Sequence, residues 1–215
     1  MSFNYQDKKH DAPAMRDRES GFSMVELMIV CVIMVLIAGL AIPNIYRAFR
    51  NYQLDSAGHS VASLLQQARM QAVKTNLPAY ANFSNGTSVN TAFVSNDPAT
   101  TYTPGNPAGN PEVQISTAVS FQTAPPDHAQ LDAYLNGTTP PVPGPIGFNA
   151  RGLPCSETGG NPTVCGATST GFEWFMQSAG GWEAITVTPS GRIKSWRLSQ
   201  QTGGSSACGY AACWI

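Results

Sequence analysis

The sequence is poor in charged residues. Asp, Glu, Lys and Arg together make up 12% of its 215 residues, and the formal net charge is −1. So small a net charge does not predict binding to nucleic acid or to an anionic membrane surface, although local clusters can still act. The hydrophobic share of 42% is enough for a real core and argues against a chain that is disordered throughout.

Histidine is also scarce, and none of the three histidines stands in a catalytic pattern. His10 lies in the hydrophilic start of the chain, His59 follows Asp55 by four residues, and His128 lies in a Pro-rich segment. No nucleophile or ligand set stands beside any of them, and Asp55 with His59 is interpreted as a surface pair on a helix. We therefore expect no enzymatic activity, no catalytic residue and no cofactor.

One long hydrophobic run stands near the start of the chain. From Phe22 to Ile42 there are 21 residues with a single charged side chain, Glu26. About 20 apolar residues can cross the hydrocarbon core of a bilayer, so one membrane helix is predicted. The basic residues of the preceding leader are Lys8, Lys9, Arg16 and Arg18. They favour a cytoplasmic N-terminus, although acidic residues make the leader neutral overall.

Three simpler interpretations compete for this run. A secretory signal would be cut after it, for example at Gly39-Leu40-Ala41, but the leader is long for that class. An uncleaved signal anchor does not explain the position of Glu26. A capping box between Ser23 and Glu26 does not explain why the hydrophilic leader ends at Gly21, directly before Phe22.

The segment Gly21-Phe22-Ser23-Met24-Val25-Glu26, followed by the apolar run and then Pro43, resembles the class III signal of type IV pilins and pseudopilins. The resemblance implies cleavage after Gly21 by a prepilin peptidase, which then methylates the new N-terminal amine of Phe22. It also implies that Glu26 meets the N-terminal amine of a neighbouring subunit when filaments assemble through this helix.

The cost of burying a carboxylate agrees with this implied role of Glu26. An acidic side chain at the centre of a membrane helix costs roughly 2.5–3.5 kcal/mol on insertion scales. The Phe22 ammonium of a staggered neighbour would offset that cost and set the axial register between subunits.

Beyond Pro43, apolar residues recur at three- and four-residue steps, which predicts an amphipathic helix that ends near Asn76-Leu77-Pro78. The expected apolar positions are Leu54, Ala57, Val61, Leu64, Leu65, Ala68 and Ala72. After the helix, short runs of β-branched and aromatic residues predict an antiparallel sheet packed on it. The predicted strands are 80–83, 88–94, 113–122, 146–149, 172–177, 184–188 and 192–198, of which the last three form a meander. Long Pro- and Gly-rich connections are expected at 96–111 and 124–145.

The predicted fold class is therefore α+β, with a long N-terminal helix on an antiparallel β-sheet domain. The expected organisation is a cleaved cytoplasmic leader, 1–21; a membrane-spanning and assembly segment, 22–43; an amphipathic segment, 44–76; and a periplasmic β-rich domain, 77–215. The protein would be a single-pass protein of the inner membrane until its incorporation into a filament.

The five cysteines agree with that compartment. Cys31 lies in the membrane helix and is interpreted as a small apolar packing residue. Cys155, Cys165, Cys208 and Cys213 form two close pairs in loop-like sequence, which predicts two disulfides in an oxidising periplasm. Local pairing is preferred, but four cysteines allow three connectivities. Their spacings do not reproduce the C-x2-C of zinc sites, so no metal is expected.

Two segments in the second half of the chain indicate a particular group within this family. The segments "GFNARGLP" and "WEAITVTPSGRIKSWR", after a long helix and polar strands, resemble the GspH/FimT group of minor pseudopilins and minor pilins. Members of that group sit in low copy at the tip of a type IV pilus or a type II secretion pseudopilus and help to initiate assembly. The sequence does not distinguish the two machines.

Two alternatives remain. Some FimT-like minor pilins take part in DNA uptake, and Arg192 and Lys194 share a predicted strand face with Trp196, whereas Arg197 points to the other face. A solvated strand with one core tryptophan is the favoured interpretation of this pattern, so DNA contact by Arg192 and Lys194 is a hypothesis only. The other alternative is a conventionally secreted globular binding protein whose helix is merely a signal.

Overall fold

The computed structural model describes residues 23–102, 110–123, 127–136, 145–158, 161–198 and 213–215. The chain divides into two compact units, residues 1–43 and residues 44–215. A single helix, α1 (Met24–Thr75), contributes to both. It ends as the sequence predicts, because Asn76 adopts a left-handed φ of 55° and Pro78 follows.

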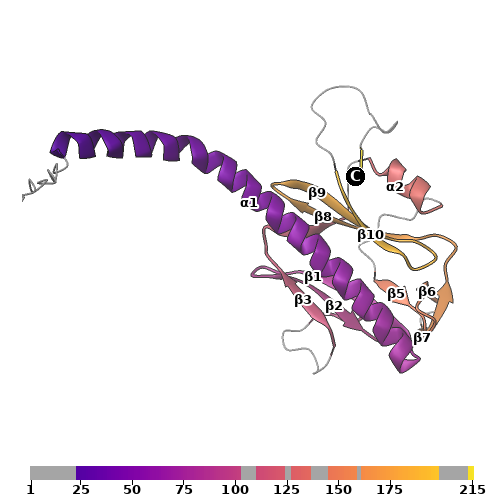
Figure 1. The fold of residues 1–215 in the computed structure, drawn as a ribbon. Helices are drawn as coiled ribbons and strands as arrows, with labels where there is room; N and C mark the ends of the chain where they lie inside the picture. The colour runs from indigo at the N-terminus through magenta and orange to yellow at the C-terminus, as the bar shows by residue number, and fades with distance from the viewer. Residues whose placement is uncertain (1–22, 103–109, 124–126, 137–144, 159–160, 199–212) are drawn as a thin grey trace, which may run out of the picture. The chain divides into compact units, whose positions relative to one another are not determined.

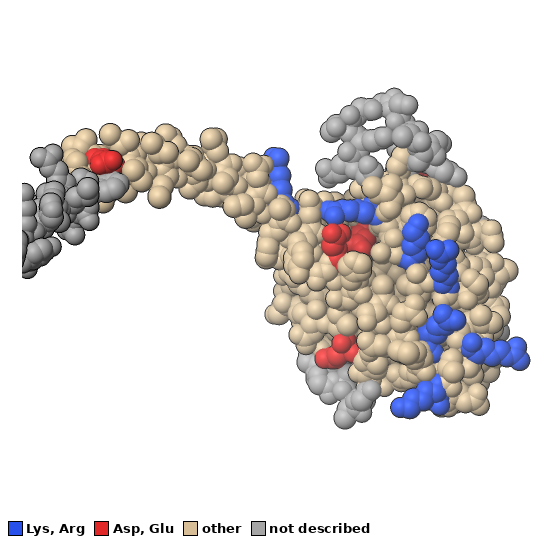
Figure 2. Space-filling model, in the orientation of Figure 1, with Lys and Arg blue, Asp and Glu red and all other residues tan. Residues whose placement is uncertain are grey.

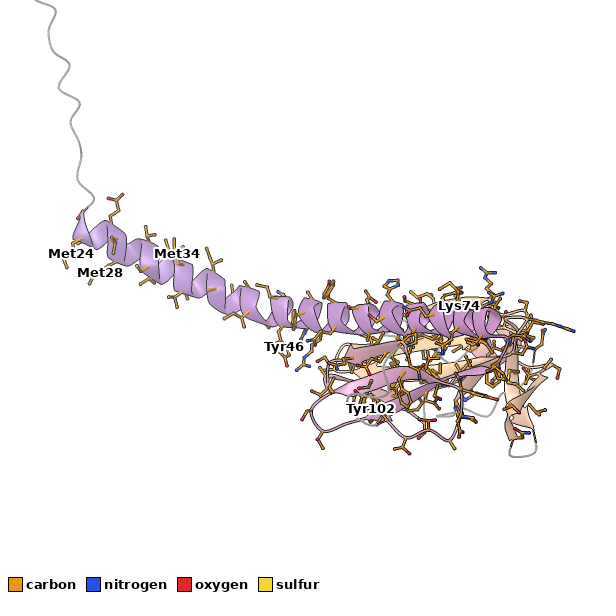
Figure 3. The ribbon with its side chains drawn as sticks, turned by 90° about the horizontal axis from the view of Figure 1, so that it is seen from below. Met24, Met28, Met34, Tyr46, Lys74 and Tyr102 are labelled. Carbon is orange, nitrogen blue, oxygen red and sulfur yellow. A yellow bond between two sulfur atoms is a disulfide. The ribbon has the colours of Figure 1, made fainter. Side chains whose placement is uncertain are left out.

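In the first unit, the described part of α1 has apolar side chains on all sides. Nearly every one of them is exposed, and Figure 3 shows Met24, Met28 and Met34 projecting outward from the helix. The helix is long and apolar enough to cross a membrane. This confirms the predicted apolar helix.

In the second unit, α1 is amphipathic and lies on antiparallel sheets (Figure 1). Its buried positions include all seven that the sequence predicts: Leu54, Ala57, Val61, Leu64, Leu65, Ala68 and Ala72. The predicted α+β fold, with the helix packed on antiparallel strands, is confirmed.

The described strands form two antiparallel sheets rather than one. The first contains, from edge to edge, β3 (Glu112–Ile115), β2 (Asn90–Ser95), β1 (Ala79–Asn85), β5 (Ile146–Phe148), β6 (Pro154–Thr158) and β7 (Asn161–Ala167). The second contains β10 (Ile193–Arg197), β9 (Gly181–Val187), β8 (Phe172–Ser178) and β4 (Val119–Gln122). Strands β8, β9 and β10 form the predicted meander.

Three predicted segments differ from the structure. The run 113–122 is two strands, because a turn in which the Val119 amide donates to the Ser116 carbonyl sends β3 and β4 into different sheets. The connection 124–145 contains a short helix, α2 (Ala129–Tyr134). The segment around Cys155 and Cys165, predicted as loop, forms the β6–β7 hairpin.

The four-stranded sheet carries a hydrophobic core on each face. Trp174, Met176 and Ile185 belong to the larger core, which includes the buried stripe of α1. Phe175 and Ala184 alternate with them and belong to a second core. That core also contains Leu131 of α2, Trp196 and Trp214. The sheet is therefore buried on both sides.

Candidate functional site

The candidate assembly site is the start of α1. The hydrogen bond from the Leu27 amide to the Ser23 carbonyl, 3.1 Å long, marks the beginning of the helix. Glu26 is exposed in the first turn and is surrounded by exposed apolar side chains. Gly21 and Phe22, the predicted processing residues, lie outside the described residues. The described part therefore presents an apolar helix with one carboxylate near its N-terminal end.

A second group of charges joins α1 to the four-stranded sheet. The Arg197 guanidinium donates to Asp55 Oδ1 at 3.0 Å. Asp55 thus pairs with β10 rather than with His59, and the predicted helix-surface pair is wrong. Arg197 and Lys194 lie on opposite faces of β10, as the strand alternation predicts.

Glu183 lies buried beside this ion pair. A Cβ added to Gly58 of α1 would come within 1.7 Å of Glu183 Oε1, so the absent side chain at Gly58 makes room for the carboxyl group. Burial raises the pKa of Glu183 to about 8; the nearby Asp55 charge adds to the rise and Arg197 opposes it. Glu183 is therefore largely protonated near neutral pH.

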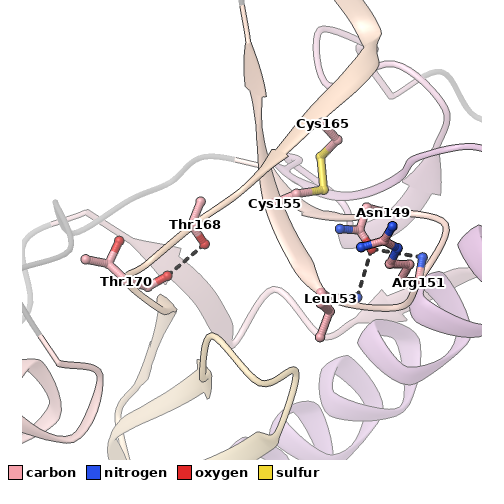
Figure 4. Close-up of a disulfide and its surroundings, with 7 residues drawn as sticks. All are labelled: Asn149, Arg151, Leu153, Cys155, Cys165, Thr168 and Thr170. Atoms are coloured by element: carbon pink, nitrogen blue, oxygen red, sulfur yellow. Dashed lines mark hydrogen bonds between the residues drawn. A yellow bond between two sulfur atoms is a disulfide. The ribbon is translucent and has the colours of Figure 1, made fainter.

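The two segments that carry the resemblance to GspH and FimT form a pair of similar turns. In 149–153 and in 188–192 the fourth residue is a glycine with positive φ, 72° at Gly152 and 80° at Gly191. In each turn the side-chain oxygen of the first residue accepts a hydrogen bond from the backbone amide of the fifth. Asn149 Oδ1 accepts from the Leu153 amide and Thr188 Oγ1 accepts from the Arg192 amide, each at 3.1 Å. Figure 4 shows the Asn149 side chain bonded to the amides of Arg151 and Leu153.

Arg69 of α1 joins the two turns. Its Nη1 donates to the Gly191 carbonyl at 3.1 Å, and its side chain also lies next to Gly152. Arg151 and Arg192 are exposed within these turns. Figure 2 shows several Lys and Arg side chains gathered on one face of the second unit.

The predicted DNA contacts, Arg192 and Lys194, occupy different settings. Arg192 lies in the turn before β10, whereas Lys194 is on the strand itself. The Lys194 ammonium lies 3.3 Å from the centroid of the Trp196 ring, which is a cation–π contact. The Trp196 indole donates to Thr186 Oγ1 at 2.8 Å and is buried, so the prediction of a core tryptophan agrees with the structure.

Sequence reasoning missed a third polar group, because Glu173 is distant in the chain from the other two members, His128 and Asp132. His128, next to α2, lies 3.3 Å from Asp132 and 3.4 Å from Glu173 of β8. Glu173 is fully buried. Burial raises its pKa to about 8, and the charge of Asp132 adds to the rise. The prediction that no ligand set stands beside any histidine is therefore wrong for His128, because Asp132 and Glu173 lie next to it.

Two of the predicted disulfide cysteines are joined. Cys155 and Cys165 form a disulfide across β6 and β7, with their Cα atoms 5.3 Å apart (Figure 4). Cys213 is also disulfide-bonded, while Cys208 lies outside the described residues. Cys31 is free and exposed in the apolar part of α1.

An apolar helix whose second half packs on antiparallel strands is the arrangement that the resemblance to type IV pilins and pseudopilins implies. A family model described as the prokaryotic N-terminal methylation motif matches residues 16–42, and one described as type II transport protein GspH matches residues 57–191. The second match covers more than half of the chain, which therefore belongs to the GspH family. No match was found among curated proteins or solved structures.

This membership defines the broad class of the protein. It is a minor pilin or pseudopilin of a type IV pilus or a type II secretion system, a family of structural subunits. The methylation motif includes Gly21, Phe22 and Glu26 and implies processing by a prepilin peptidase and assembly with other pilins. Together with the apolar helix, it indicates a single-pass anchor in the inner membrane.

The raised pKa of Glu183 makes stability depend on pH. Between about pH 4.5 and pH 8 the folded protein holds a proton that the unfolded chain has released, so the contribution of this group to stability falls as pH rises. We expect Glu183→Gln to lessen the fall in Tm between pH 5 and pH 8 by an amount equivalent to a few kcal/mol. Thermal unfolding monitored by circular dichroism measures it.

Glu112→Gln is the matched control, because Glu112 is exposed on β3 and should leave the pH profile as in wild type. A Glu183→Gln profile that coincides with the wild-type profile would contradict a protonated Glu183.

Proposed function

We propose that this protein is a minor subunit that enters a filament through the N-terminal segment of α1 and acts at the tip to initiate assembly. In this proposal, prepilin peptidase cuts after Gly21 and methylates Phe22. The observation that carries it is an apolar surface around the start of α1 with one carboxylate, Glu26, in the first turn. The tip position rests on the resemblance to minor pilins.

The physical argument is the mismatch between Glu26 and its surroundings. A charged side chain in hydrocarbon is costly when it is unpaired, and the cost falls when an opposite charge approaches it. A neighbouring subunit's Phe22 ammonium would supply that charge, because cleavage after Gly21 creates it four residues before Glu26 and an axial stagger between subunits would bring the two groups level. The pair would therefore form only between processed subunits.

The rest of the chain would be divided by environment. Segment 22–43 would occupy the membrane and then the filament core, while 44–76 and the β-rich 77–215 would lie in the periplasm. Both hydrophobic cores lie within the compact unit 44–215. This supports the proposal that the globular part folds before the subunit is assembled into a filament.

Loss of the Glu26 charge should impair assembly. Breaking a buried ion pair by removing one partner costs about 3–5 kcal/mol, so we expect Glu26→Gln and Glu26→Ala to enter filaments at least about tenfold less than wild type. The measurement is the ratio of this subunit in sheared filaments to its level in the membrane.

Glu112→Gln again serves as the control, since it removes an acid from an exposed strand. Incorporation of Glu26→Gln at the wild-type ratio would overturn the pairing role.

DNA binding is a second candidate function, and the paired turns favour it. Arg69 contacts both turns, and each turn carries one exposed arginine, Arg151 or Arg192. Together these three arginines supply more positive charge than Arg192 and Lys194 alone. Closely spaced guanidinium groups suit phosphate oxygens. In this proposal, Arg192 contacts the DNA backbone, whereas Lys194 contributes less because it stacks on Trp196.

Salt-dependent gel shifts test DNA binding. We expect Arg151→Ala with Arg192→Ala to weaken binding and to lower the salt slope by up to about 2. An Arg192→Ala, Lys194→Ala variant should lose less. Arg47→Ala with Arg50→Ala removes two charges from α1 outside the turns and should bind as wild type does. No shift by the wild-type protein at low salt would eliminate this function.

A further inference from the structure

Three ligand-type side chains converge between α2 and the four-stranded sheet. His128 directly precedes α2, Asp132 lies one turn further along, and Glu173 comes from β8 on the face that α2 covers. One possible ligand atom from each residue lies within 4.8 Å of the other two. Glu173 is 45 residues away from His128 in sequence, so only the fold creates the group.

Four polar atoms of this group are buried and lack hydrogen-bond partners among the described residues. Both carboxyl oxygens of Glu173 are buried without a hydrogen bond, as are His128 Nδ1 and Asp132 Oδ1. A buried polar group without a partner is costly, and native proteins rarely retain several in one place. Such a group therefore indicates a ligand that is shared among them.

The distances also suit a shared ion better than direct bonds. His128 Nδ1 lies 3.3 Å from Asp132 Oδ2 and 3.4 Å from Glu173 Oε1, yet neither contact has hydrogen-bond geometry. Two ligand atoms that are each about 2.1 Å from a tetrahedral Zn²⁺ lie about 3.4 Å apart. The observed separations of Nδ1 from the two oxygens match two edges of that tetrahedron.

We propose that His128, Asp132 and Glu173 bind a divalent transition-metal ion, of which Zn²⁺ fits best. Ca²⁺ and Mg²⁺ prefer oxygen ligands, whereas an imidazole with two carboxylates suits zinc. The two carboxylates balance the charge of the ion. His128 and Asp132 are partly exposed, so water can fill the fourth position and the ion can enter.

The ion would fasten α2 to the sheet. α2 has only six residues, and its contribution to the second core comes mainly from Leu131. A metal bound by residues on both α2 and β8 stabilises their association, because the ion binds the folded arrangement and not the unfolded chain. This role is independent of filament assembly and of DNA binding.

Zinc titration of the full-length protein in detergent tests the proposal. The protein carries Cys31→Ser to remove the free thiol, is stripped with EDTA, and is titrated with ZnCl2 against a chromophoric chelator. We expect one ion per chain with a Kd of about 1 µM or lower, together with a rise in Tm. Glu173→Gln and His128→Gln should each weaken binding by at least about tenfold.

His59→Gln is the matched control, because His59 is exposed and belongs to no group of three possible metal ligands among the described residues. It should bind zinc as the parent does. His128 is partly exposed, so His128→Gln tests the site even if Glu173→Gln fails to fold. Absence of stoichiometric binding, or equal binding by His128→Gln and the parent, would overturn the zinc site and leave a histidine paired with carboxylates.

Discussion

The apolar stripe of α1 from Leu54 to Ala72 is the contact on which the rest of the globular unit depends. Its residues are buried in a core shared with strands of both sheets, so one helix holds together two sheets that do not exchange strands. The periodicity of the same helix changes near Pro43, before which apolar residues occupy all sides. One helix thus combines a segment suited to hydrocarbon with a segment suited to a protein core.

Two acidic side chains are buried where helices pack on the four-stranded sheet. Two buried glutamates lie on neighbouring strands of one sheet, Glu183 toward α1 and Glu173 toward α2, and burial raises the pKa of each. The Glu183 carboxyl group occupies the space left by the missing side chain of Gly58, next to the ion pair of Arg197 and Asp55. This space explains how an acidic side chain fits between the helix and the sheet. Glu173 lies 3.4 Å from His128 Nδ1, but neither of its carboxyl oxygens has a hydrogen bond among the described residues, which is why it directs attention to a ligand.

Local periodicity explains what could be predicted. The buried positions of α1 follow a 3.6-residue repeat, and the β8–β10 meander has clear turns at Gly180-Gly181 and Ser190-Gly191. The break between β3 and β4 was missed because Ser116-Thr117-Ala118 contains neither Gly nor Pro. Strands β6 and β7 were missed because their sequence is rich in Ser, Thr and Gly.

Contacts between distant residues could not be predicted in this way. The bond from Arg197 to Asp55 spans 142 residues, and the group around His128 depends on the docking of α2 against β8. The spacing of His128 and Asp132, four residues apart, is visible in the sequence, but nothing in the sequence pattern indicates that Glu173 joins them or that Arg197 reaches Asp55. The class III signal is different, because its residues are close together in the chain: the N-terminal methylation motif matches residues 16–42, and Gly21, Phe22 and Glu26 all lie within that segment.

Mass spectrometry of the N-terminus of the mature protein, purified from cells that contain prepilin peptidase, tests the central claim most directly. The account predicts a chain that begins at Phe22 and carries one methyl group on its amine. A mature protein that retains residues 1–21, or one that begins after Ala41, would contradict it.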